Sequence, residues 1–121
     1  MPGVNKIKHK GKEILFIDYK GCRSEEEMVE ILKQAQKIII EDNKEYLQLT
    51  DLTDAFATPS YMKEAKKVAK DTPKLAKRRA IVGINSPGRK ILLKGYNLIL
   101  GKEAIRPFDG LEKAKDWITA D

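Results

Sequence analysis

The stretch "EILFIDYKGCRSEEEM", from Glu13 to Met28, contains the change from strand to helix on which the predicted fold is built. Its first part, Glu13–Tyr19, is rich in β-branched and aromatic residues, which is typical of a buried strand. Its second part begins a helix. Ser24 and Glu27 have the spacing of a capping box, and three acids in the first turn suit the positive end of the helix dipole. The stretch therefore predicts one strand–helix unit of an α/β protein.

Periodicity on both sides of this stretch extends the unit. Apolar residues continue at helical spacing to a predicted end near Asp42-Asn43; they are Met28, Ile31, Leu32, Ala35, Ile38 and Ile39. Upstream, Val4–Lys10 alternates weakly around Ile7 and is followed by a turn at Gly11-Lys12. The first segment is therefore expected to pair back on Glu13–Tyr19 as an antiparallel strand.

Three further strands and three further helices are predicted downstream. The strands are "EYLQLTD" (Glu45–Asp51), "AIVGIN" (Ala80–Asn85) and "EAIRPF" (Glu103–Phe108). The helices start at Thr58-Pro59, at about Arg89 with Gly101 as the C-cap, and at Asp109 with Glu112 as a capping pair. The order ββαβαβαβα predicts one α/β domain over residues 1–121, whose single sheet is mostly parallel with one antiparallel edge strand.

Composition limits the function classes. The chain has 121 residues, 41% hydrophobic and 35% charged, and no apolar run near the roughly 20 residues that a bilayer span needs. Its first residues lack the apolar region of a signal peptide, so a cytoplasmic protein is expected. The single cysteine, Cys22, excludes an internal disulfide and a cysteine-based zinc cluster. No nucleophile, phosphate-loop or dinucleotide motif occurs, so we expect neither an enzyme nor a cofactor.

The net charge of +6 is concentrated in one segment, Lys63–Lys94, which contains eleven basic residues and only two acids. The candidate basic patch within it comprises Lys63, Lys66, Lys67, Lys70, Lys74, Lys77, Arg78 and Arg79. Such a patch would suit nucleic acid or an anionic membrane surface, and it would equally serve as a solvated face that keeps the protein soluble. Only Tyr61 is close enough in sequence to stack on bases, which argues against nucleic acid.

A second candidate site follows from the parallel strands, because their carboxyl ends meet at one edge of the sheet. The predicted rim comprises Arg23, Thr50, Asp51, Thr53, Asp54, Thr58, Ser60, Ser86, Arg89 and Lys90. Positive charge, hydroxyls and helix N-termini there suit a small anionic ligand, although any mixed polar rim contains such groups. Asp51 and Asp54 fall short of a complete magnesium site, and loop hydrogen bonds are their expected role, so no metal is predicted.

Four motifs in order, "ILFIDYKG", "LTDLTD", "AIVGIN" and "PFDGLEKAKDWI", resemble the SpoIIAA-like family of STAS-type domains between about Ile14 and Ile118. These are small bacterial and archaeal proteins whose fold is also similar to CRAL-TRIO lipid-transfer domains. The resemblance implies a non-enzymatic regulatory or binding domain. Anti-sigma-factor antagonists of this type carry a phosphorylatable Ser in a "DSSG" sequence after the third strand. This chain reads "ATPSYM" there, so Thr58 and Ser60 are only candidate phosphoacceptors, and capping accounts for Thr58 without a kinase.

Two forms of binding function remain open from the sequence. A protein partner would dock on the helical face, or a homodimer would form through Tyr96–Leu100, because Leu93, Leu98 and Leu100 cannot all face inward. A small anionic or lipidic ligand would instead bind at the strand ends, and its lipidic form predicts an enclosed apolar cavity.

Overall fold

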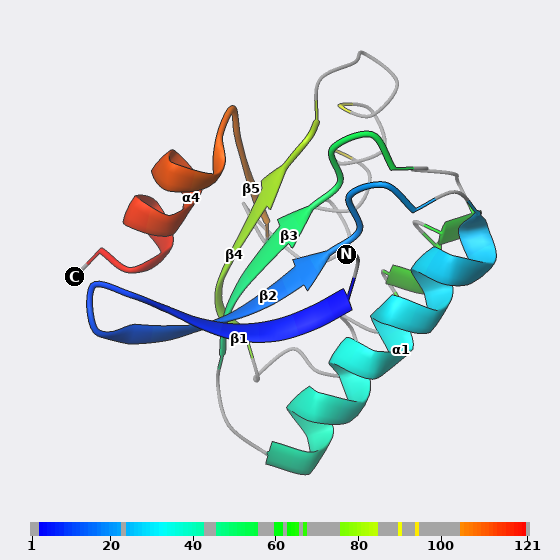
Figure 1. Ribbon diagram of the computed structural model, residues 1–121, viewed down its shortest axis with the longest axis horizontal. Coiled ribbons are helices and arrows are strands. Elements are labelled where there is room, and N and C mark those ends of the chain that lie inside the picture. The colour runs from blue at the N-terminus through cyan, green and yellow to red at the C-terminus, as the bar shows by residue number, and fades with distance from the viewer. Residues whose placement is uncertain are drawn as a thin grey trace.

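The computed structural model describes residues 3–22, 24–42, 46–55, 60–61, 63–65, 67, 76–84, 90, 94 and 105–120. Its elements are β1 (Gly3–His9), β2 (Lys12–Asp18), α1 (Glu25–Asp42), β3 (Tyr46–Asp51), β4 (Ala76–Val82), β5 (Arg106–Phe108) and α4 (Leu111–Ile118) (Figure 1). The described residues between 60 and 67 are also helical. Within these ranges, no helix has the length and apolar character needed to cross a bilayer.

The strands form one five-stranded sheet in the order β1-β2-β3-β4-β5. β1 pairs with β2 antiparallel, and each later strand pairs with its predecessor in parallel. The predicted α/β architecture, a mostly parallel sheet with an antiparallel edge strand, is therefore confirmed. The hairpin turn lies one residue earlier than predicted, at Lys10 and Gly11, because both have positive φ (52° and 80°), as a type I′ turn requires.

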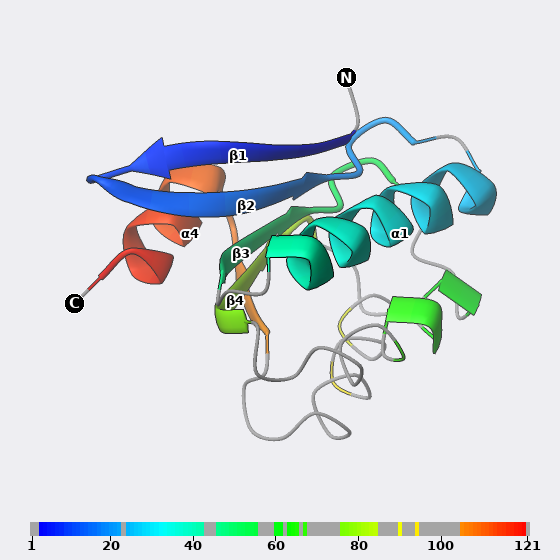
Figure 2. The ribbon, with the colours of Figure 1, turned by 90° about the horizontal axis from the view of Figure 1, so that it is seen from below.

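The sheet lies between helices on its two faces. Figures 1 and 2 show α4 on one side and α1 on the other, and the helical residues between 60 and 67 lie on the side of α1. Side chains alternate along each strand, so neighbouring residues belong to different cores. Ile14, Leu49 and Ala80 pack with α4, whereas Leu15, Ile17 and Ile81 belong to the core that includes α1.

The beginning of α1 follows its sequence signal. The Glu27 N–H donates to Ser24 Oγ at 3.2 Å, which satisfies one of the free donors of the first turn. The apolar face is buried as predicted, with Met28, Ile31, Leu32, Ala35 and Ile39 in the core. This helix also forms one wall of a groove described below.

The predicted boundaries of β4, β5 and the last helix are wrong. β4 begins at Ala76 rather than Ala80, because parallel pairing with β3 extends the strand back through its charged residues. The prediction that Asp109 caps the last helix also fails. The N-cap is Gly110, in extended conformation and without a side-chain hydrogen bond, so the helix starts one residue later. β5 begins at Arg106 rather than Glu103 and has three residues, and β4 ends at Val82 rather than Asn85.

Candidate functional site

The four parallel strands end level with one another, so their trailing loops begin at one edge of the sheet. Asp18, Asp51 and Val82 are register partners across three strands, and Val82 is in turn opposite Phe108. Two backbone bonds continue the ladder past the strands. The Tyr19 N–H donates to the Asp51 carbonyl at 2.9 Å, and the Leu52 N–H donates to the Val82 carbonyl at 2.8 Å.

The carboxylates at this edge are engaged in closing the loops. Asp18 Oδ1 accepts the Lys20 N–H at 2.9 Å, and Asp51 Oδ1 accepts the Thr53 N–H, also at 2.9 Å. Both are turns in which a side chain replaces a backbone acceptor. Asp51 is 4% exposed. Among the residues that the structure describes, no group of three His, Cys, Asp or Glu side chains could hold a metal ion.

Gly83 lets the loop after β3 lie directly on the end of β4. Its φ is +100°, and a Cβ added there would lie 2.5 Å from the Thr53 nitrogen and 2.7 Å from the Leu52 carbonyl carbon. Only glycine tolerates both the conformation and the contact. The geometry of this edge therefore depends on a backbone-to-backbone contact.

The described members of the predicted rim do not form one exposed surface. Thr50 and Asp51 are buried, Thr53 is half-buried, and Asp54 is exposed with a positive φ of 56°. Ser60 and Lys90 are exposed helical residues. The other four members, Arg23, Thr58, Ser86 and Arg89, lie outside the described residues. Within the described part, carboxylates rather than cations dominate the rim.

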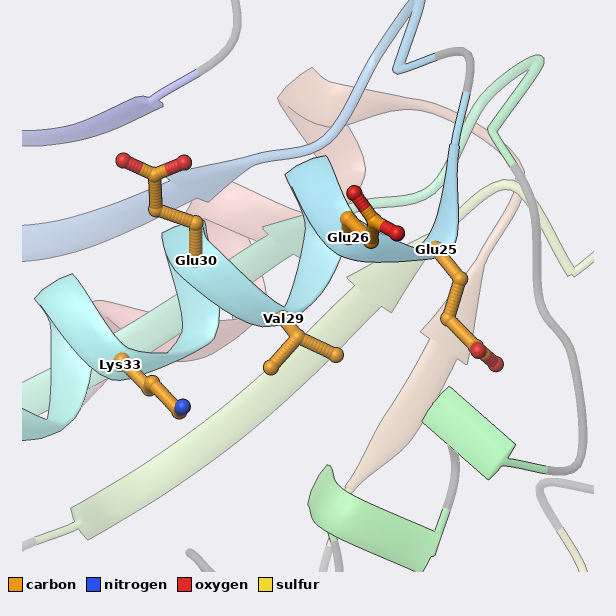
Figure 3. Close-up of a pocket in the computed structure, with 5 residues that line it drawn as sticks. All are labelled: Glu25, Glu26, Val29, Glu30 and Lys33. Carbon is orange, nitrogen blue, oxygen red and sulfur yellow. The ribbon is translucent and has the colours of Figure 1, made fainter.

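A groove runs between α1 and the helical residues from 60 onward. It has a volume of about 480 Å³ and is lined by Glu25, Val29, Lys33, Ser60, Lys63 and Glu64. The described residues that line an adjoining hollow of about 380 Å³ all belong to α1; they are Glu25, Glu26, Val29, Glu30 and Lys33. Figure 3 shows Glu25, Val29 and Lys33 pointing from α1 toward the neighbouring helical segment, while Glu30 points away from it.

Helical geometry explains this wall of the groove. Glu25, Val29 and Lys33 recur at four-residue spacing and therefore form one stripe on α1. Glu25 and Val29 are half-buried and Lys33 is exposed. The opposite wall supplies exposed Lys63 and Glu64, so among the described residues each wall carries charges of both signs, with Val29 between them. Sequence alone did not predict this groove, because its walls come from separate helical segments.

Among the described members of the predicted basic patch, Arg78 lies on a different face of the sheet from the others. Lys63 and Lys67 are exposed on the side of α1. Arg78 and Arg79 are successive residues of β4 and point to opposite faces. Arg78 donates to the carbonyls of Trp117 and Ala120, each at 2.8 Å, so it lies on the α4 side. Lys66, Lys70 and Lys74 lie outside the described residues; Lys77 is in β4, and its side chain is not described.

His9 contacts a carboxylate that lies far from it in the sequence. His9 Nε2 lies 2.8 Å from Asp116 Oδ1, and Lys10 Nζ lies 3.2 Å from the same oxygen. The hydrogen bond from His9, followed by that from Lys10, lowers the pKa of the Asp116 carboxyl. These contacts join the first hairpin to α4. His9 and Asp116 are 107 positions apart, a separation that local sequence patterns do not reveal.

At the carboxyl end of α1, Lys6 forms an ion pair with Asp42 at 2.8 Å, and Tyr46 also donates to that carboxylate. The hydrogen bond to Asp42 raises the pKa of Lys6. The only thiol, Cys22, is 2% exposed, and burial raises its pKa. Lys6 and Tyr46 bind the carboxyl end of α1 to the sheet, and Cys22 is buried in the core just before its amino end. We therefore assign these groups a structural role.

Comparisons of the chain with protein-family models, with curated proteins and with solved structures find no match. The candidate sites therefore rest on their own geometry. The predicted dimer helix, Tyr96–Leu100, lies outside the described residues.

Proposed function

We propose that this chain is a non-enzymatic binding domain of the STAS, SpoIIAA-like type, and that it docks a protein partner on the face of its sheet that α1 covers, here called the helical face. The observation that carries the proposal is the groove between α1 and the helical residues from 60 onward. The order of motifs in the sequence supports the same class. In this proposal Ser60, one of the two candidate phosphoacceptors, contributes to the docking surface.

The chemistry of the groove favours a protein surface over a lipid. Glu25 and Lys33 on one wall face Lys63 and Glu64 on the other, and Val29 lies among them. Charges of both signs around a small apolar centre suit a partner with complementary charges, because electrostatic complementarity provides specificity and orientation. A lipid chain would need an apolar lining, whereas these residues are mostly charged and solvent-exposed.

A small anionic ligand at the carboxyl edge has weaker support. The described side chains there include Asp18, Asp51 and Asp54, which would repel an anion. The N–H groups of Lys20 and Thr53, which an anion would otherwise accept from, already donate to Asp18 and Asp51. The helical face is therefore the better candidate among the described parts.

The non-enzymatic assignment rests on the state of the two groups best suited to acid–base or nucleophilic chemistry. His9 is the only histidine of the chain, and it is engaged with Asp116 on the surface. Cys22 is the only cysteine, and its buried thiol has a raised pKa, which disfavours the reactive thiolate. The two groups also lie apart, one in β1 and the other before α1.

The experiment is site-specific photo-crosslinking in the native cells. A benzophenone amino acid replaces Lys33, which lines the groove, or Gln34, which is exposed on the same helix but does not line it. We expect a discrete protein adduct from position 33 and none from position 34. The double substitution Lys33→Glu with Lys63→Glu should abolish binding of the recovered, purified partner, because two charges facing it change sign.

The control for charge is Lys37→Glu, on the exposed surface of α1 outside the groove. It should leave binding within about twofold, since exposed charges outside an interface contribute little. Equal adducts from positions 33 and 34, or equal loss of binding in the Lys37 variant and the double variant, would contradict the proposed docking face.

A further inference from the structure

A cluster of arginine and aromatic side chains occupies the opposite side of the sheet, at the β5 edge. The guanidinium carbon of Arg106 lies 5.3 Å from the centre of the Trp117 ring and 5.5 Å from that of Phe108. Arg78 lies 5.6 Å from the same Trp117 ring, and the two rings are 5.5 Å apart at an angle of 42°. We call Arg78, Arg106, Phe108 and Trp117 the arginine–tryptophan cluster.

The two arginines have different positions and roles. Arg78 is half-buried and donates to the Trp117 and Ala120 carbonyls, so it caps the carboxyl end of α4, where positive charge is favourable. Arg106 is exposed on the edge strand, and within the described residues no carboxylate pairs with it. Its guanidinium donors are therefore accessible to a ligand, while the two rings hold its position.

Among the described residues, neither Arg106 nor Lys113 forms an ion pair with an acid of α4. Lys113 is exposed one helical turn before Trp117, so both lie on the same flank of α4. The acids of α4 are engaged elsewhere: Asp116 pairs with His9 and Lys10, and Glu112 with Lys115. Phe108 and Trp117 are only half-buried. The surface thus combines accessible aromatic rings with cations, as sites for single-stranded nucleic acid do.

We propose that the arginine–tryptophan cluster, together with Lys113, binds single-stranded nucleic acid. A base stacks on the exposed side of the cluster, against a ring or the Arg106 guanidinium, and the cations contact the phosphates on either side. This surface lies on the other face of the sheet from the proposed docking groove, so the two proposals stand independently.

The sequence argument against nucleic acid considered only aromatic residues close to the basic segment. Folding changes that relation, because β4 directs Arg78 toward Trp117, 39 residues away. Arg106 and Phe108 are brought to the same ring by β5. The predicted patch on Lys63–Lys94 and this cluster therefore share only Arg78.

Trp117 is the only tryptophan of the chain, so its fluorescence reports on the cluster directly. The protein is titrated with oligothymidylate or oligouridylate of about 12 nucleotides, within the range that one small domain covers. A strand of equal length without bases serves as the control ligand. We expect quenching by the base-bearing strands and binding at least about tenfold weaker for the abasic strand, because stacking then no longer contributes. The relative affinities for the two base-bearing strands distinguish DNA from RNA.

The matched variants are Arg106→Ala and Lys37→Ala, each of which removes one exposed cation, on opposite sides of the sheet. Arg106→Ala should weaken binding about tenfold and reduce the slope of log affinity against log salt by about 0.7, the value for one phosphate contact on a single strand. Lys37→Ala should change neither. Circular dichroism checks that both variants are folded, and Lys113→Ala provides a second test that does not alter the cluster itself.

Three results would overturn the proposal. Equal affinity for abasic and base-bearing strands would reduce the surface to a general polyanion site. Quenching by anionic vesicles but by neither oligonucleotide would make its partner a membrane. Unchanged binding in both the Arg106 and Lys113 variants would place the contact elsewhere on the protein.

Discussion

Replacing Gly83 by alanine tests whether the loops after β3 and β4 are packed together at the carboxyl edge of the sheet. Two costs add at this position. A residue with a side chain is strained at a φ of +100°, by about 1–3 kcal/mol. Its Cβ would also lie 2.5 Å and 2.7 Å from backbone atoms of the loop after β3, and backbone cannot move aside as easily as the end of a flexible side chain. Displacing that backbone costs about 1–3 kcal/mol more, as overpacking does.

Gly83→Ala should therefore lower the free energy of unfolding by about 2–6 kcal/mol, a large part of the 5–15 kcal/mol typical of a domain. Gly21→Ala is the matched control, because Gly21 has a φ of +82° and no atom within 4 Å of an added Cβ. It should show only the conformational cost and be less destabilising by about 1–3 kcal/mol. The assay is urea unfolding followed by circular dichroism. Equal losses in the two variants would refute the close contact between the two loops.

Two further predictions concern ionisable groups. Because His9 and Lys10 lower the pKa of Asp116, the ionised carboxylate stabilises the fold above its ordinary pKa of 3.8, and this contribution is lost as the pH falls through the lowered value. Urea unfolding across that acidic range should thus show a shallower loss of stability for Asp116→Asn than for the unaltered protein, and identical pH profiles would contradict the ion pair. Burial raises the pKa of Cys22 and shields its sulfur, so we expect the native thiol to react with a disulfide reagent at least about tenfold more slowly than the thiol of the urea-unfolded chain. Equal rates would show that the thiol is accessible.

The sequence predicted the parts of the fold that depend on neighbouring residues. Ser24 and Glu27 marked the start of α1, and the spacing of its apolar residues gave its buried face. The alternation of strands and helices predicted the parallel run of β2 to β5. These features are local or follow from chain order, so one-dimensional patterns contain them.

The errors arose where the three-dimensional context outweighs the local pattern. The predicted strand began at Ala80 and left out Arg78 and Arg79, but pairing with β3 makes them part of β4. Alternation then directs them to opposite faces, which divides the predicted basic patch. At the last helix, Asp109 fitted a capping pair by spacing, although Gly110 takes the extended N-cap conformation.

The candidate sites were the least predictable features, because each joins distant segments. The groove needs Lys33 of α1 beside Lys63, and the arginine–tryptophan cluster needs Arg106 of β5 beside Trp117 of α4. No spacing rule connects such pairs. The predicted rim correctly placed the loops at one edge, but it did not foresee that Asp51 would be buried in a turn.

The most direct test of the docking proposal is a backbone amide shift map of the isotope-labelled chain during titration with the partner recovered by crosslinking at position 33. We predict the largest shifts at residues 25–33 and 60–64, the two walls of the groove, and little change in α4. Shifts centred on residues 18–22 and 51–55 at the carboxyl edge, or on α4, would contradict binding through the helical face.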